Sequence, residues 1–151
     1  MILLDSDVLI DLLRKYSPAV RWFDALPEDE ELMVSGYVVM ELIQGCRNKA
    51  EQERVQREIG TYGVVWLSPK DCDSALEVFA AYRLSHNAGL LDVLIGQTAV
   101  ALGVPLLTFN QRRYSFIKEA AHQQAHSHHR ARPAIAPVSL SASRPPTCLK
   151  V

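Results

Sequence analysis

The stretch MILLDSDVLIDLL, residues 1–13, decides the fold class. Its first four residues form a short, continuous apolar run, which is typical of a strand covered on both faces. A helical pattern follows from Val8 to about Lys15, and Asp5 to Asp7 supply acceptors for its free amides. We therefore expect a buried strand that leads into a helix at the start of the chain.

The same alternation continues to about residue 120. Further strands are predicted at Leu32–Ser35, Gly63–Leu67 and Val104–Thr108. The helices predicted between them are Ser17–Leu26, a helix that starts near Ser35 and carries Glu41, a polar helix within Gln44–Gly60, Asp71–Leu84, and Leu91–Leu102 ending at Gly103. Strands separated by helices in this order favour an α/β fold with a parallel sheet and helices on both faces.

Charge and composition divide the chain in two. Residues 121–151 hold four of the 16 basic residues and none of the 17 acidic ones, so residues 1–120 carry 12 basic and 17 acidic side chains, a net charge of −5. The second part is rich in His, Ala, Ser and Pro and shows no apolar period. We expect one domain over residues 1–120 and a basic, disordered or weakly structured tail over residues 121–151.

Several protein classes are disfavoured by the same composition. No apolar run approaches the ~20 residues that span a bilayer, and the start of the chain lacks the basic flank and cleavage site of a signal peptide. The three cysteines are an odd number at no metal-like spacing, which indicates neither a disulfide framework nor a zinc site. A soluble, cytoplasmic protein without a membrane partner is expected.

Three acidic side chains lie within or beside stretches that otherwise indicate core. They are Asp5 after residues 1–4, Glu41 within residues 37–43 and Asp92 within residues 89–95. An isolated buried carboxylate costs several kcal/mol unless it is paired, hydrogen-bonded or metal-bound, so three of them suggest a shared divalent cation. Asp5 and Asp92 could instead merely cap helices, whereas Glu41 lies inside an apolar helical stretch and is harder to explain that way.

The predicted topology brings these acids to one edge of the sheet. In open parallel sheets, ligands bind beyond the carboxyl ends of the strands. Asp5 follows the first strand and Asn110 follows the last, and the helices that carry Glu41 and Asp92 can face the same edge. All four side chains offer hard oxygen ligands, which suit Mg²⁺ or Mn²⁺.

Four motifs in this order resemble the PIN domain, and most closely the VapC-type toxins of prokaryotic toxin–antitoxin pairs. The motifs are ILLDSDVLIDLL at 2–13, VMELIQG at 39–45, LDVLIGQTA at 91–99 and LLTFN at 106–110, with Phe116 nearby. The resemblance covers residues 1 to about 117. It implies a three-layer α/β/α fold with a short central parallel sheet of four to five strands, and a Mg²⁺- or Mn²⁺-dependent endoribonuclease.

The resemblance also assigns residues to the site. Asp5, Glu41 and Asp92 match the three acids of the family, and Asn110 stands where the family often has a fourth Asp and sometimes Asn. Thr108 matches a Thr or Ser before that position. Asp7 stands where the family often has Asn, and it is a possible additional metal ligand, because Asn110 supplies no negative charge for a second ion.

From these matches we expect the following roles. Asp5 and Asp92 bind the metal directly, and Glu41 binds it or orients the attacking water. Asn110 and Thr108 hold water or phosphate. Arg112 and Arg113, just after the last strand, either grip the RNA backbone or form an exposed helical turn.

The resemblance further implies partners and one departure. A cognate antitoxin that covers the acidic site and a homodimer are expected beside the RNA substrate. PIN domains usually add a last short strand beyond the position of Phe116, whereas this sequence runs into Ala121-His122-Gln123-Gln124. A truncated or frameshifted carboxyl end would explain that difference, and would bear on stability and dimerisation.

Two other functions stay open from the sequence. Residues 3–9 and 106–108 also resemble two motifs of haloacid-dehalogenase-like phosphatases, but Glu119 is the only acid after Thr108, where that family needs a later Lys and a further acidic pair. The second alternative is a catalytically weak PIN-like binding module. The sequence leaves the RNA target and the number of metal ions open.

Overall fold

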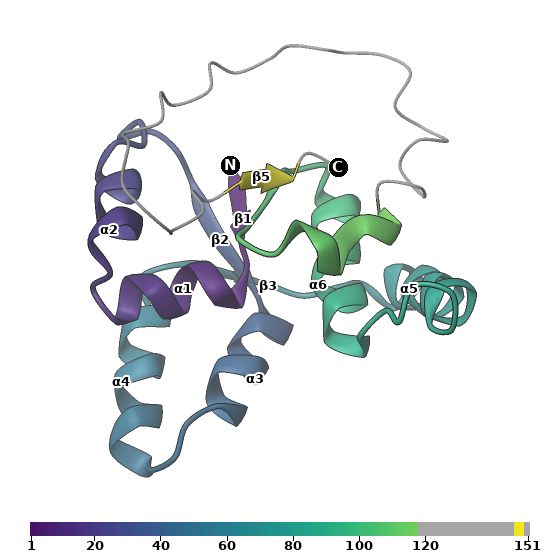
Figure 1. Ribbon diagram of the computed structural model, residues 1–151, viewed down its shortest axis with the longest axis horizontal. Helices are drawn as coiled ribbons and strands as arrows, with labels where there is room; N and C mark the ends of the chain where they lie inside the picture. Colours follow the sequence, from purple (N-terminus) through teal and green to yellow (C-terminus); the bar gives the residue numbers. More distant parts are fainter. Residues whose placement is uncertain (118–146, 150–151) are drawn as a thin grey trace.

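A computed structural model describes residues 1–117 and 147–149 and has a five-stranded sheet at its centre (Figure 1). The strand order is β3-β2-β1-β4-β5. Strands β1 to β4 pair in parallel, and β5 pairs antiparallel with β4. The strands are β1 (Ile2–Leu4), β2 (Leu32–Ser35), β3 (Gly63–Val65), β4 (Leu106–Thr108) and β5 (Thr147–Leu149). The expected α/β architecture with a four-stranded parallel sheet is confirmed.

Helices connect the parallel strands and lie around them. Figure 1 shows α2 and α4 on one side of the strands and α5 and α6 on the other. Helix α3 packs against α1, α4 and α6, so it joins the two groups. The helices are α1 (Ser6–Leu13), α2 (Ser17–Asp24), α3 (Gly36–Gln44), α4 (Lys49–Ile59), α5 (Pro69–Tyr82), α6 (Leu90–Leu102) and the 3₁₀ helix η1 (Gln111–Tyr114). None of the described helices is long and apolar enough to cross a membrane.

Local side-chain caps explain where several helices begin. Ser35, Asn48 and Ser68 each accept a hydrogen bond from a backbone N–H in the first turn of the following helix. Asp5 does the same for α1, which starts at Ser6 and therefore two residues before the predicted Val8. Helix α6 ends at Gly103 in the left-handed conformation, φ 63°, which glycine adopts without steric cost.

The register of the strands sets the position of the acidic residues. Leu4 pairs with Val34 on one side and with Leu107 on the other. The residues that follow these three, Asp5, Ser35 and Thr108, therefore lie at the same level of the carboxyl-terminal edge of the sheet. All three are buried. The start of α1, the start of α3 and the loop after β4 consequently meet at this edge.

The core explains the continuous apolar runs. Strands β1 and β4 are buried at every position, as expected for strands covered on both faces. From α6, Val93, Ile95 and Ala99 are buried against the same core. Burying one such aliphatic side chain contributes about 1.5–3 kcal/mol to the free energy of folding. The strands next to the acidic residues are therefore held in place by a well-packed core.

The structure departs from the sequence prediction at Thr147–Leu149, within the segment expected to be disordered or weakly structured. These residues form β5 and add a last short strand to the sheet, which the sequence was expected to lack. A free strand edge exposes unpaired N–H and C=O groups, and pairing with β5 satisfies those of β4. Three residues are too few to produce a detectable apolar alternation. The rest of the tail, 121–146 and 150–151, lies outside the described residues.

Candidate active site

Asp5 is both a helix cap and a buried acid. Its side chain accepts a hydrogen bond of 2.7 Å from the Ser6 N–H, and its own backbone N–H donates to the Leu107 carbonyl at 2.9 Å. The residue is only 2% exposed. Burial raises the pKa of Asp5, and the negative charge of Glu41 raises it further. The capping role is therefore real, but it does not remove the cost of a buried charge beside a second acid.

Asp7 fastens α1 to the loop that follows β4. Its Oδ2 accepts hydrogen bonds from the Thr108 hydroxyl at 3.2 Å and from the Phe109 N–H at 3.0 Å. The Thr108 hydroxyl in turn accepts from the Asn110 N–H at 3.0 Å. Thr108 is fully buried and Asn110 is exposed. Thr108 thus orders the loop that presents Asn110, and direct contact of either side chain with substrate stays a prediction.

The second carboxylate oxygen of Asp7 accepts no such hydrogen bond from the described residues. Its Oδ1 is buried and has no hydrogen-bond partner within the described residues. Burial and the neighbouring charge of Asp5 raise the pKa of Asp7 to about 6. Asp7 therefore adds a third source of negative charge density to the edge defined by Asp5 and Glu41.

Glu41 and Asp92 reach the site from α3 and α6 and share one cationic neighbour. Arg113 Nη1, from η1, lies 3.8 Å from Glu41 Oε1 and 3.6 Å from Asp92 Oδ1. The Oε2 atom of Glu41 is buried without a hydrogen-bond partner in residues 1–117. Burial raises the pKa of Asp92, which the positive charge of Arg113 opposes and the charges of Asp5 and Glu41 reinforce. The three acids therefore act on one another electrostatically, although Asp5 comes from the start of α1, Glu41 from α3 and Asp92 from α6.

Gly89 gives Asp92 the room to take this position. The N-cap residue of α6 is Gly89, and it makes no side-chain cap bond. A Cβ placed at Gly89 would lie 2.4 Å from Asp92 Oδ2. The carboxylate of Asp92 thus lies against the start of its own helix, where the helix dipole favours a negative charge. Capping and a site role are compatible for Asp92, as they are for Asp5.

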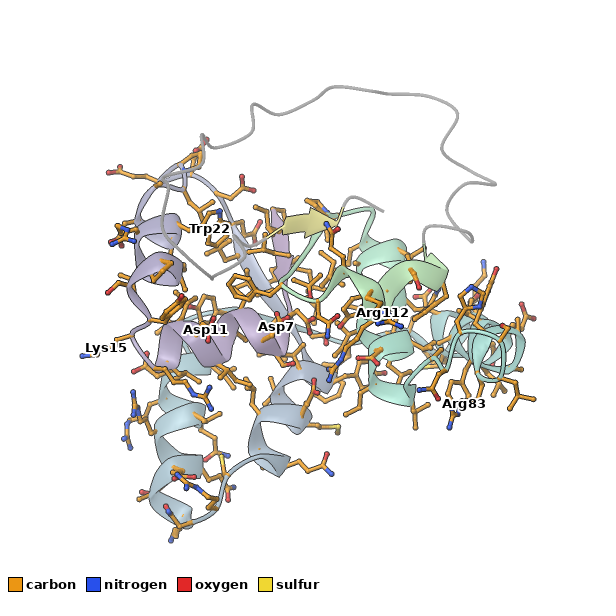
Figure 2. All side chains as sticks on the ribbon, viewed as in Figure 1. Asp7, Asp11, Lys15, Trp22, Arg83 and Arg112 are labelled. Carbon is orange, nitrogen blue, oxygen red and sulfur yellow. The ribbon has the colours of Figure 1, made fainter. Side chains whose placement is uncertain are left out.

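The two arginines of η1 differ in their contacts. Arg113 forms the ion pairs with Glu41 and Asp92 and has a half-exposed side chain. Arg112 is exposed, and Figure 2 shows it between Asp7 and Arg83 in this view. The pair therefore forms a helical turn, as one reading of the sequence expected, and that turn lies directly over the acidic cluster.

The donor chemistry of this cluster fits a divalent cation. Every candidate ligand offers oxygen, and two carboxylate oxygens are buried without a hydrogen-bond partner in the described part of the chain. Burial and mutual repulsion raise the pKa of Asp5, Asp7 and Asp92. Within residues 1–117 and 147–149, however, no three acidic, His or Cys side chains are already grouped so that they could hold one ion. The guanidinium of Arg113 supplies the positive charge between Glu41 and Asp92.

Tyr114 is a member of the site that sequence reasoning missed. Its side chain is fully buried, and its hydroxyl lies beside the Asp5 carboxyl, whose pKa it lowers. Burial raises the pKa of Tyr114, and the charges of Asp5 and Asp92 add to that effect. The hydroxyl therefore lies in the field of the acids. No sequence pattern separates this tyrosine from the neighbouring core residue Phe116.

Comparisons with known proteins agree with the fold. The profile of the PIN domain family matches residues 2–121. The chain therefore belongs to the PIN-domain family, and the three-layer α/β/α PIN fold expected from the sequence is confirmed.

Particular relatives are VapC-type proteins. The chain is 35% identical over 133 residues to "Ribonuclease VapC10" of Mycobacterium tuberculosis (strain CDC 1551 / Oshkosh), which covers 87% of this chain and 99% of the relative. Among solved structures, it is similar to a toxin–antitoxin complex from Klebsiella pneumoniae, with TM-score 0.60, 24% identity and coverage of 76% and 91% of the two chains. It also resembles VapBC-1 from nontypeable Haemophilus influenzae, with TM-score 0.62, 22% identity and coverage of 79% and 94%.

Proposed function

We propose that this protein is a Mg²⁺- or Mn²⁺-dependent endoribonuclease and the toxin of a toxin–antitoxin pair. The observation that carries the proposal is that Asp5, Glu41 and Asp92 lie at one edge of the sheet and act on one another electrostatically, while one buried oxygen each of Glu41 and Asp7 has no hydrogen-bond partner among the described residues. The name of the 35% identical relative, a ribonuclease, supports the choice of RNA as the substrate.

The acidic cluster needs a cation before it can hold the phosphodiester that is cleaved. Residues 1–120 carry a net charge of −5, and the acids at this edge would repel a phosphodiester. Asp5 and Asp92, with Glu41, would hold the ion, and Asp7 would add to its electrostatic stabilisation. When bound, such an ion supplies an activated water and stabilises the leaving oxygen of an in-line displacement.

The other residues of the site have supporting roles in this proposal. Arg113 pairs with Glu41 and Asp92 in the structure. Once a bound cation neutralises these two acids, the Arg113 guanidinium would be free to pair with a substrate phosphate instead. The hydrogen bonds from Thr108 and Phe109 to Asp7 fix the loop that carries Asn110. Asn110 and Arg112 then lie at the exposed margin, where they would contact RNA or its water shell.

The proposal includes partners. A solved structure similar to this chain is named as a toxin–antitoxin complex, which supports a cognate antitoxin that covers the acidic edge. A basic side chain of the antitoxin would meet the same carboxylates that Arg113 meets. We also propose a homodimer that acts in the cytoplasm, as the family resemblance implies.

A substrate panel tests this function and separates it from its alternatives. The purified protein is incubated with structured RNA, single-stranded DNA and p-nitrophenyl phosphate, each with Mg²⁺, with Mn²⁺ or with EDTA. We expect cleavage of RNA alone, only with a divalent cation, and at internal positions. Hydrolysis of p-nitrophenyl phosphate without RNA cleavage would favour the phosphatase, and metal binding without any hydrolysis would favour the binding module.

A further inference from the structure

Two surface hollows border the acidic site. The first, here called the α1–α4 hollow, has a volume of about 540 Å³ and lies between α1, α3 and α4. The second, the α5–α6 hollow, has a volume of about 690 Å³ and is lined by Arg83, Asp92 and Arg113 among others. Glu41 lines both hollows. A chain molecule that passes the acidic cluster would therefore have space on either side of it.

Basic residues are concentrated in these hollows. Residues 1–120 contain 12 basic side chains against 17 acidic ones, yet six of the 12 line one hollow or the other. In the α1–α4 hollow the acidic lining residues are Glu41 and Glu51, and the basic ones are Arg14, Lys15, Arg47 and Arg54. An acidic domain thus presents a locally positive surface directly beside its acidic site.

Two of these four basic side chains form contacts within the fold that explain their presence. Arg47 forms an ion pair of 2.8 Å with Glu51, and Arg54 donates a hydrogen bond to the Leu13 carbonyl, which holds α4 against the end of α1. Arg14 and Lys15 are different. Both are exposed, and neither side chain forms a hydrogen bond or ion pair within the residues that the structure describes.

The backbone at Lys15 is a second indication. Lys15 follows the C-cap residue Arg14 and has a φ of 55°, the left-handed conformation in which glycine or asparagine is usual. A lysine there is less stable than a glycine would be, and its side chain forms no hydrogen bond or ion pair with the described residues that would offset this. Non-glycine residues held in this conformation cluster at ligand-binding positions.

We propose that the α1–α4 hollow binds the RNA strand next to the cleavage site, with Arg14 and Lys15 contacting backbone phosphates. This inference rests on the proposed function. It adds a second site that binds RNA, beside the cleavage site, and the path along which the strand crosses the protein. Figure 2 shows Lys15 at the end of α1 remote from Asp7, with Arg83 on the opposite side of the site. The strand would run from the α1–α4 hollow past Glu41 to the α5–α6 hollow.

RNA binding without catalysis tests the inference separately from the proposed function. The full chain carrying Asp92→Asn binds a fluorescent oligouridine in EDTA, and anisotropy gives its affinity over a series of salt concentrations. Adding Arg14→Gln and Lys15→Gln is expected to weaken binding at least about tenfold at low salt, and to reduce the slope of log affinity against log salt by about 1.4, or about 0.7 for each lost contact with a single strand.

The control removes the same charge elsewhere. Arg21→Gln with Lys70→Gln changes two exposed cations outside both hollows and is expected to alter the affinity by less than about twofold. Equal losses in the two double variants would mean that only net charge matters and would overturn the inference.

Labelled oligoglutamate is the second probe. If it binds through Arg14 and Lys15 while oligouridine does not, the hollow is a docking site for an acidic polypeptide and the RNA assignment is wrong. Loss of oligouridine binding in the first pair alone supports the inference, even if no cleavage is ever found.

Discussion

Replacing Asp92 with asparagine is expected to reduce RNA cleavage by at least about 100-fold without unfolding the protein. Residues that only orient metal ligands typically contribute 10–100-fold to affinity or activity, so loss of a direct ligand should reach the upper end of that range. Asparagine keeps the size of the side chain and one oxygen. The fold should tolerate it, because burial raises the pKa of Asp92 and the charged form is already disfavoured there.

The Asp92→Asn experiment measures both the rate of RNA cleavage and the thermal stability of the variant. Cleavage of structured RNA is measured at saturating Mg²⁺, and thermal unfolding is followed in EDTA. Asp73→Asn, an exposed acid on α5, is the matched control and should retain the wild-type rate. Full cleavage by Asp92→Asn would contradict the proposed ligand role, and a large drop in melting temperature would show instead that Asp92 is needed for the fold.

Replacing Gly96 with alanine is expected to destabilise the protein by about 1–3 kcal/mol, the usual cost of overpacking a core. A Cβ at Gly96 would lie 1.8 Å from Ile117 Cδ1 and 3.4 Å from Tyr114 Cδ1. Both neighbours are buried. In an open helix the same change would be stabilising by roughly 0.8–1 kcal/mol, so the sign of the effect reports the packing directly.

The consequence of Gly96→Ala for activity follows from the same contacts. Helix α6 packs against η1, and η1 carries Tyr114 and Arg113 to the acidic cluster. We therefore expect slower cleavage even at temperatures where the variant is folded. Ile117→Val removes the Cδ1 atom, and in that background Gly96→Ala should cost less than it does alone. Equal costs in both backgrounds, measured by urea denaturation, would show that the Gly96–Ile117 contact does not limit packing.

The parts of the fold that could be predicted from the sequence are those with strong local patterns. The apolar runs at β1 and β4 indicate strands covered on both faces, and they are buried at every position. The caps Ser35 and Ser68 and the terminating Gly103 place the helix ends within a few residues. The short strand β5 could not be found this way, because its place in the sheet depends on pairing with β4 and not on its own composition.

The site was predictable where residue type and topology agree, and not where it depends on side-chain contacts. Asp5, Glu41 and Asp92 were expected at one edge because parallel strands end there together, and their charges do act on one another. The ion pairs of Arg113 depend on how η1 packs on α6, which no local pattern encodes. The same holds for the buried hydroxyl of Tyr114 and for the bond from Thr108 to Asp7 across 101 residues of sequence.

A Mn²⁺ titration of the metal-free protein tests the central claim most directly. Bound Mn²⁺ is counted by electron paramagnetic resonance, and RNA cleavage is measured on the same samples, for the wild type and for Asp5→Asn, in which asparagine can still cap α1. The account predicts that the cleavage rate of the wild type rises in step with bound Mn²⁺, and that Asp5→Asn neither binds the ion at these concentrations nor cleaves. Full cleavage by the metal-free wild type, or unchanged Mn²⁺ binding by Asp5→Asn, would contradict it.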